Sequence, residues 1–177
     1  MINIYGKGGH ARMIASLLNE PYFFYNDKDY ETAETHPWVI AIGDNTSRKK
    51  VATSNLINTH YLTINKGIYV AADYIGIGVQ IMPGVVIQNG VVINDHTIIN
   101  TSASIDHDCV IGEYSHIAPN ATLCGDVKIG NGTLIGAGVV ILPGITIGNN
   151  CIIGAGSVVN KNVFDNTKVF GNPAKIK

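Results

Sequence analysis

The chain has 177 residues and a formal net charge of −1, from 12 lysine and arginine residues against 13 aspartate and glutamate residues. This balance provides no positive field for nucleic acid or an anionic membrane surface, so neither is expected as a partner. The sequence has no run of about 18 apolar residues and no signal-like start, so we expect a cytoplasmic protein.

Residues 1–60 predict a small Rossmann-like α/β domain. In chain order, the apolar runs and turns predict a strand at 2–5, a helix at 11–19, strands at 22–25 and 38–42, and a helix from 47 to about 56. Strands that alternate with helices in this way are typical of a parallel sheet.

A glycine-rich turn, Gly6-Lys7-Gly8-Gly9-His10, joins the first strand to the first helix. Such a turn offers backbone N–H groups and the positive end of a helix dipole to a phosphate. Asp27 ends the second strand, where a ribose or base contact is expected. The turn is not a full GxGxxG motif, because Ala11 stands where the third glycine would be. A domain of this size suits a mononucleotide, and a turn that serves only helix packing is the alternative.

From Ile75 to Ile153 an aliphatic residue recurs every six positions. The residue four positions after each of these is in most cases small or β-branched. Glycine, asparagine and proline between them supply tight corners. Neither a helix nor a hairpin meander has this period. Three hexads close one triangular coil, so residue i lies beneath residue i+18. We predict a β-helical prism over residues 75–158, within a second domain at 61–177.

Two histidines in the middle coils are candidate catalytic residues. His107 projects from a corner between Asp106 and Asp108, and either carboxylate could hold one ring nitrogen protonated while the other nitrogen accepts a proton. Gly125, directly above, leaves room for a thioester carbonyl and a backbone N–H for its oxyanion. His116 is predicted on the opposite face, on the order of 15 Å away from strand rise alone. The two histidines can therefore share a site only between chains, which predicts a trimer.

Other reactive side chains are assigned structural roles. His96 lies at a corner beside Asp95 and is interpreted as a surface histidine. Cys109 and Cys151 occupy inward positions and are predicted to be buried packing residues. The cysteines form no CxxC pair, so reduced thiols are expected and no metal site is predicted.

Several motifs spread over nearly the whole chain point to one family. They are the strand and glycine turn that end at His10, Ile40-Ala41-Ile42-Gly43-Asp44-Asn45 with Arg48-Lys49-Lys50, Asn100-Thr101, Asp106-His107-Asp108-Cys109-Val110-Ile111-Gly112, Ser115-His116, and Gly171-Asn172-Pro173-Ala174-Lys175. Together they resemble the PglD/NeuD-type hexapeptide-repeat sugar acetyltransferases of bacteria, whose prism is a left-handed parallel β-helix.

The resemblance implies an acetyl-CoA-dependent N-acetyltransferase that acts on a nucleotide-linked sugar of the UDP-4-amino-4,6-dideoxy type, by direct transfer in a ternary complex. It implies His107 as the general base and Asp108, where glutamate is common, as its orienting partner. Acetyl-CoA contacts are expected from His116, Gly125, Ala137 and Lys175. Nucleotide-sugar contacts are expected from Gly6, Gly8, Gly9, His10, Asn26, Asp27 and Asn100, with Asn26 departing from the usual pair of aspartates.

Three other functions remain open. O-acetylation of sialic acid or another sugar hydroxyl is the nearest alternative. A metal hydratase like the γ-class carbonic anhydrases shares the prism, but it needs three ligands and His107 and His116 lack a nearby third histidine. A non-catalytic nucleotide-sugar-binding scaffold is the third. For the leading function we expect a homotrimer with its active sites between subunits.

Overall fold

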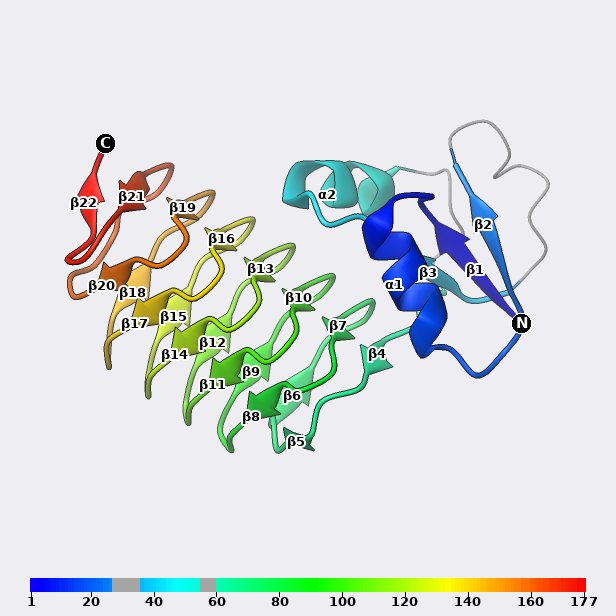
Figure 1. The fold of residues 1–177 in the computed structure, drawn as a ribbon, viewed down its shortest axis with the longest axis horizontal. Coiled ribbons are helices and arrows are strands. Elements are labelled where there is room, and N and C mark those ends of the chain that lie inside the picture. Colours follow the sequence, from blue (N-terminus) through cyan, green and yellow to red (C-terminus); the bar gives the residue numbers. More distant parts are fainter. Residues whose placement is uncertain (27–35, 55–59) are drawn as a thin grey trace. The chain divides into compact units, whose positions relative to one another are not determined.

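The computed structural model of the protein describes residues 1–26, 36–54 and 60–177 (Figure 1). The chain divides into two compact units, Met1–Thr63 and Ile64–Lys177, and each has its own hydrophobic core. Within these described ranges, no helix is long and apolar enough to cross a membrane.

The first unit contains a three-stranded parallel sheet in the order β2-β1-β3. Its elements are β1 (Ile2–Tyr5), α1 (Gly9–Leu17), β2 (Tyr22–Tyr25), β3 (Trp38–Ile40) and α2 (Asn45–Thr53). The predicted parallel pairing is confirmed, because β1 pairs in parallel with both neighbours. Every residue of β1 is buried, as expected for a central strand. Asp44 caps α2, since its carboxylate accepts a hydrogen bond of 2.8 Å from the backbone N–H of Ser47.

The second unit is a prism of stacked coils with three sheet faces, and its strands are two or three residues long. The first face contains β4 (Ile64–Asn65), β7 (Gln80–Ile81), β10 (Ile98–Ile99), β13 (His116–Ile117), β16 (Leu134–Ile135), β19 (Ile152–Ile153), β21 (Lys168–Phe170) and the antiparallel β22 (Lys175–Ile176). The second face contains β5 (Tyr69–Val70), β8 (Val86–Ile87), β11 (Ser104–Ile105), β14 (Thr122–Leu123), β17 (Val140–Ile141) and β20 (Val158–Val159). The third face contains β6 (Tyr74–Ile75), β9 (Val92–Ile93), β12 (Val110–Ile111), β15 (Lys128–Ile129) and β18 (Thr146–Ile147).

The strands pair with the spacing of 18 that the hexad period predicts. Ser104 lies opposite Thr122, and Val110 lies opposite Lys128. These stacked parallel strands fit the expected left-handed β-helix. The prism also extends beyond the periodic stretch, because its first coil begins at Ile64, which pairs with Gln80. That spacing is shorter than 18, so the six-residue pattern does not reveal the first coil.

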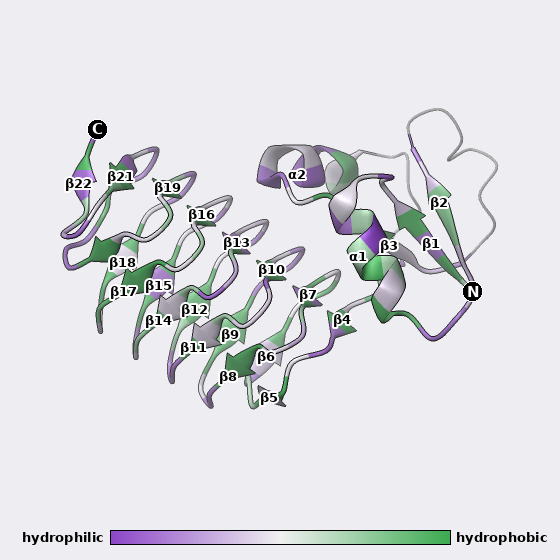
Figure 2. Ribbon diagram, in the orientation of Figure 1, coloured by the Kyte–Doolittle hydropathy of each residue, from purple (hydrophilic) through white to green (hydrophobic). Residues whose placement is uncertain are grey.

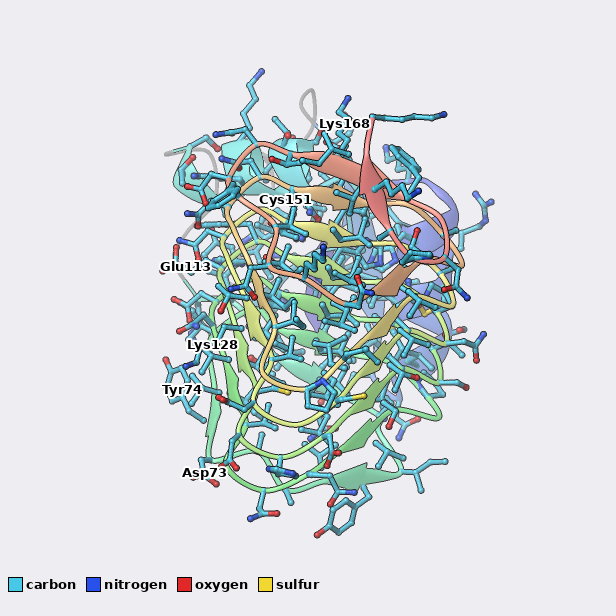
Figure 3. The ribbon with its side chains drawn as sticks, turned by 90° about the vertical axis from the view of Figure 1, so that its left-hand side faces the viewer. Asp73, Tyr74, Glu113, Lys128, Cys151 and Lys168 are labelled. Carbon is cyan, nitrogen blue, oxygen red and sulfur yellow. The ribbon has the colours of Figure 1, made fainter. Side chains whose placement is uncertain are left out.

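Inward side chains fill the prism axis with aliphatic and small residues. In Figure 2 hydrophobic residues accordingly recur in the stacked strands of the prism. Cys109 and Cys151 belong to this core, as predicted, and burial raises the pKa of the Cys109 thiol to about 11. Polar side chains such as Tyr74, Glu113 and Lys128 project outward along one side (Figure 3).

One corner is held by a ladder of side chains between coils. The Oδ1 atom of Asn131 accepts the N–H of Glu113 at 2.9 Å, and Asn149 accepts the N–H of Asn131 at 2.8 Å. Asp95 and Asp165 make the same contact in other coils. These bonds satisfy corner N–H groups that the strand ladders leave without a partner.

The interpretation of His96 as a surface histidine is wrong. His96 is only 5 % exposed, and its ring stacks on Tyr114 with centroids 5.3 Å apart and planes at 11°. The cause is the vertical stacking of residues 18 apart, which covers a corner side chain when the coil above carries a large ring.

Candidate active site

A depression of about 550 Å³ lies at one corner of the prism and is open to solvent. Its lining comes from three successive coils: Asp106, His107, Cys124, Gly125, Asp126, Pro143 and Gly144. The lower part of this lining is the turn between β11 and β12, and residues 124–126 lie one coil above it because the coils repeat every 18 residues. Asp106 and Asp126 line the depression, and Asp108 lies beside His107. Three carboxylates and one imidazole therefore meet at one corner of the prism.

His107 is held by the carboxylates on both sides of it in the sequence. Its Nδ1 atom lies 2.7 Å from Oδ2 of Asp108, and its backbone N–H donates to Oδ1 of Asp106 at 2.8 Å. Asp108 adopts a left-handed backbone conformation with a φ of 62°, as other non-glycine residues at the prism corners do. Both the His107 and the Asp108 side chain are more than half exposed, so the pair is accessible to a substrate.

The hydrogen bond from Asp108 raises the pKa of His107 above its ordinary value of 6.5, and the charge of Asp106 adds to this effect. Both carboxylates stabilise the imidazolium form. When His107 loses its proton, the remaining hydrogen stays on Nδ1, where Asp108 accepts it. The basic atom is then Nε2, on the far side of the ring from Asp108.

Gly125 lies directly against the His107 ring, as the stacking rule predicts. A Cβ atom at Gly125 would lie 2.6 Å from both Cε1 and Nε2 of His107, which is closer than real Cβ contacts come. The absence of a side chain is therefore what allows the ring to sit here.

His116 and Asn100 lie on the first face, away from this corner. His116 begins β13, Asn100 follows β10, and these two strands pair directly. The Nδ2 atom of Asn100 lies 3.0 Å from Nε2 of His116. The structure thus brings together two residues that the sequence analysis assigned to different substrates.

Ala137 and Lys175 are both exposed, and neither lines the depression. Ala137 lies in the corner after β16, where its carbonyl accepts the N–H of Gly156 at 2.8 Å. Lys175 lies in β22, opposite Phe170.

The predicted nucleotide-binding residues follow the carboxyl ends of the parallel strands in the first unit. Gly6 has a φ of +124°, and a Cβ there would lie 2.9 Å from the carbonyl oxygen of Ala41, so only glycine brings the turn this close to the end of β3. Gly8 caps α1, Gly9 begins it, and His10 lies in its first turn. Asn26 directly follows β2, and Asp27 lies outside the described residues.

Arg48 is a residue whose role the sequence analysis missed. Its side chain is fully buried, and its guanidinium donates to the carbonyl oxygens of Ile42 and Gly43 at 3.0 and 3.1 Å and to Oδ1 of Asn45 at 2.8 Å. These bonds hold the loop after β3 at the same sheet edge as the Gly6 turn. In the sequence Arg48 stood out only as part of the Arg48-Lys49-Lys50 motif, one residue after the predicted helix start at 47.

Asp126 and Cys124 were also missed at the corner. The stacking rule that identified Gly125 would have placed them too, since they lie 18 residues beyond Asp108 and Asp106. Among the described residues of this single chain, no group of three or more histidine, cysteine, aspartate or glutamate side chains could hold a metal ion.

The family described as "Bacterial transferase hexapeptide (six repeats)" matches residues 90–125 and 126–161. Among solved structures, PerB from Caulobacter crescentus in complex with CoA and GDP-perosamine is 31 % identical with a TM-score of 0.91, and the match covers 99 % of this chain and 96 % of that one. The acetyltransferase domain of PglB from Neisseria gonorrhoeae is 29 % identical with a TM-score of 0.89, over 99 % and 98 % of the two chains. WeeI from Acinetobacter baumannii is 26 % identical with a TM-score of 0.89, over 100 % and 99 %. A comparison with curated proteins gives no significant match.

Proposed function

The chain belongs to the hexapeptide-repeat sugar acetyltransferases, and on this premise we propose that it moves the acetyl group of acetyl-CoA to the amino group of a nucleotide-linked sugar. The observation that carries the proposal is the His107–Asp108 pair seated against Gly125 in an open depression. Two of the similar structures contain the matching molecules: PerB holds CoA and GDP-perosamine, and the PglB domain holds acetyl coenzyme A.

In the proposed reaction, Nε2 of His107 accepts a proton from the sugar amine as the amine nitrogen attacks the thioester carbonyl. The carbonyl oxygen becomes an oxyanion, and the backbone N–H of Gly125 donates to it. The carbon–sulfur bond then breaks, and His107 returns its proton to the departing CoA thiolate. The products are an N-acetylated sugar and free CoA, with no covalent enzyme intermediate.

The charge around His107 favours an amine over a hydroxyl as the acceptor. Asp106 and Asp126 line the depression, and Asp108 lies against the ring. An amino sugar in solution is largely a cationic ammonium, which these carboxylates attract, whereas a neutral hydroxyl gains nothing from them. The ammonium releases one proton to solvent before the neutral amine attacks, and His107 accepts the second. O-acetylation of a sugar hydroxyl remains the alternative outcome of the test below.

We assign the nucleotide to the first unit, as a Rossmann-like domain over residues 1–60. The Gly6–His10 turn leads directly into α1, where backbone N–H groups and the helix dipole suit a diphosphate. The loop that Arg48 holds follows β3 at the same sheet edge, which in parallel sheets is where ligands bind. Asn26, which directly follows β2, and Asp27, the next residue in the sequence, are assigned to the ribose or base of a uridine diphosphate sugar.

We further propose a homotrimer with its active sites between subunits. His107 lies at the corner between the second and third faces, and His116 lies on the first face, so the two histidines point to different sides of one prism. Parallel packing of three prisms would bring the corner of one chain to the first face of the next. Acetyl-CoA would then contact His116, Gly125, Ala137 and Lys175.

The proposal is tested by incubating the purified protein with acetyl-CoA and each of three acceptors: a UDP-4-amino-4,6-dideoxy sugar, GDP-perosamine and sialic acid. Free thiol release is followed by colour, and the product is identified by mass. We expect thiol release and an N-acetylated product with a nucleotide amino sugar. His107→Asn should lower kcat by about 100-fold or more, whereas His60→Gln, which changes an exposed histidine outside the site, should not. Thiol release with none of the amino sugars, or a fully active His107→Asn variant, would overturn the proposal.

A further inference from the structure

His116 is engaged through one specific ring nitrogen. Its Nε2 atom lies 3.0 Å from the side-chain amide nitrogen of Asn100, and both residues are only partly exposed. Their positions are set by the coil itself, since Ile98 pairs with His116 and Asn100 follows two residues later. The contact is therefore a built feature of the first face.

The orientation of the Asn100 amide is decided by its neighbour along the chain. The backbone N–H of Thr101 donates to Oδ1 of Asn100 at 2.8 Å, and the Thr101 hydroxyl lies 3.3 Å from the same oxygen. If the amide were turned over, its NH₂ group would face a backbone N–H, and two donors cannot bond. Oδ1 must therefore face Thr101, and the NH₂ group must face His116.

This orientation sets the protonation of His116. A donor that faces Nε2 requires a lone pair on that nitrogen, so the ring is neutral and its hydrogen is on Nδ1. An imidazolium would present N–H to N–H at 3.0 Å. His107 is in the opposite situation, because its Nδ1 atom faces a carboxylate acceptor and its Nε2 atom is the basic one.

We infer that Asn100 is a positioning residue that keeps His116 as the neutral Nδ1–H tautomer. The two histidines then have separate tasks: His107 accepts the proton of the acceptor amine, and His116 acts as a hydrogen-bond donor to acetyl-CoA. The second half of this statement rests on the proposed function, whereas the tautomer itself does not.

The tautomer is measured on the full-length protein with ¹⁵N-labelled histidine, from two-bond proton–nitrogen correlations at neutral pH. His116 is assigned by the loss of its signals in His116→Gln. We expect a pyridine-like shift for Nε2 and a pyrrole-like shift for Nδ1. In Asn100→Asp, a carboxylate replaces the donor, so Nε2 should become pyrrole-like. A protonated Nε2 in the unaltered protein, or an unchanged Nε2 in Asn100→Asp, would overturn the inference.

Steady-state kinetics on the same variants measure whether the tautomer of His116 matters for catalysis. We expect Asn100→Asp to lower kcat by about 10-fold or more with KM for the nucleotide sugar within about 2-fold. Asn131→Asp is the matched control, because it adds the same charge where Asp95 and Asp165 already serve in equivalent positions. It should leave kcat and the His116 shifts unchanged. A changed tautomer with unchanged kcat would overturn the proposed role of His116 in acyl transfer but not the assignment of Asn100.

Discussion

Replacing Gly125 by alanine tests whether the position of the His107 ring is what makes this corner reactive. The added Cβ would lie 2.6 Å from Cε1 and Nε2 of His107, so the ring must retreat by about 0.8 Å to reach the 3.4 Å of ordinary contact. The His107 side chain is 55 % exposed and can move into solvent without disturbing the core. Gly125 has no left-handed φ that alanine would strain.

The expected result is a loss of activity without a loss of stability. A displacement of about 1 Å from reactive geometry costs on the order of 100-fold in rate, which corresponds to about 2.7 kcal/mol of transition-state stabilisation. When the clash caused by a substitution is relieved by movement of a surface side chain, the free energy of unfolding changes by only about 0.5 kcal/mol. We therefore expect kcat to fall by about 100-fold while Tm stays within about 2 °C.

The assay is acetyl-CoA turnover by thiol release, with thermal unfolding measured on the same samples. Gly156→Asn is the control, because Gly156 has a left-handed φ of +69° with no atom within 4 Å of a Cβ, and Asn120 holds that conformation elsewhere in the prism. This variant should retain its rate. If Gly125→Ala kept more than about half of the native kcat, the seating of His107 against Gly125 would not matter for the chemistry.

Three further substitutions test other parts of the structure. Asp108→Asn should lower the pKa of His107, because the hydrogen bond that raises it is weakened; since the base acts in its neutral form, the acid limb of the pH–rate profile should move to lower pH while kcat falls by about 10-fold. Because the pKa of His107 is raised in the folded state, protonated His107 stabilises the fold at pH values below its unfolded pKa. This contribution is lost as pH rises through the folded pKa. Asp108→Asn should therefore make the free energy of unfolding depend less on pH between these two values. Asn131→Ala removes the acceptor for the Glu113 N–H and should lower the free energy of unfolding by about 1 kcal/mol in urea titrations, with unchanged turnover. Arg48→Met should cost about 2 kcal/mol by the same measurement and should raise KM for the nucleotide sugar more than KM for acetyl-CoA; equal effects on both would contradict the assignment of the nucleotide to the first unit.

The sequence could predict only those contacts of the site that follow from the six-residue repeat or from adjacency in the chain. The stacking of residues 18 apart predicted His107 against Gly125. Adjacency in the chain left Asp106 and Asp108 as possible partners of the His107 ring, and the structure shows that Asp108 is the one in contact. Neither Asp126 nor the burial of His96 was identified, although both follow the same rule once the neighbouring coils are compared.

The sequence by itself determined the prism, its register and its core, because each hexad forms one short strand and one corner and the coil propagates by local repetition. Only the tertiary structure decided the irregular first coil, in which Ile64 pairs with Gln80, the full burial of the Arg48 guanidinium, and the direction of the Asn100 amide. Those features depend on which atoms face each other, and the six-residue repeat does not predict these contacts. A hydrogen-bond donor and acceptor can be told apart only once both partners have positions in space.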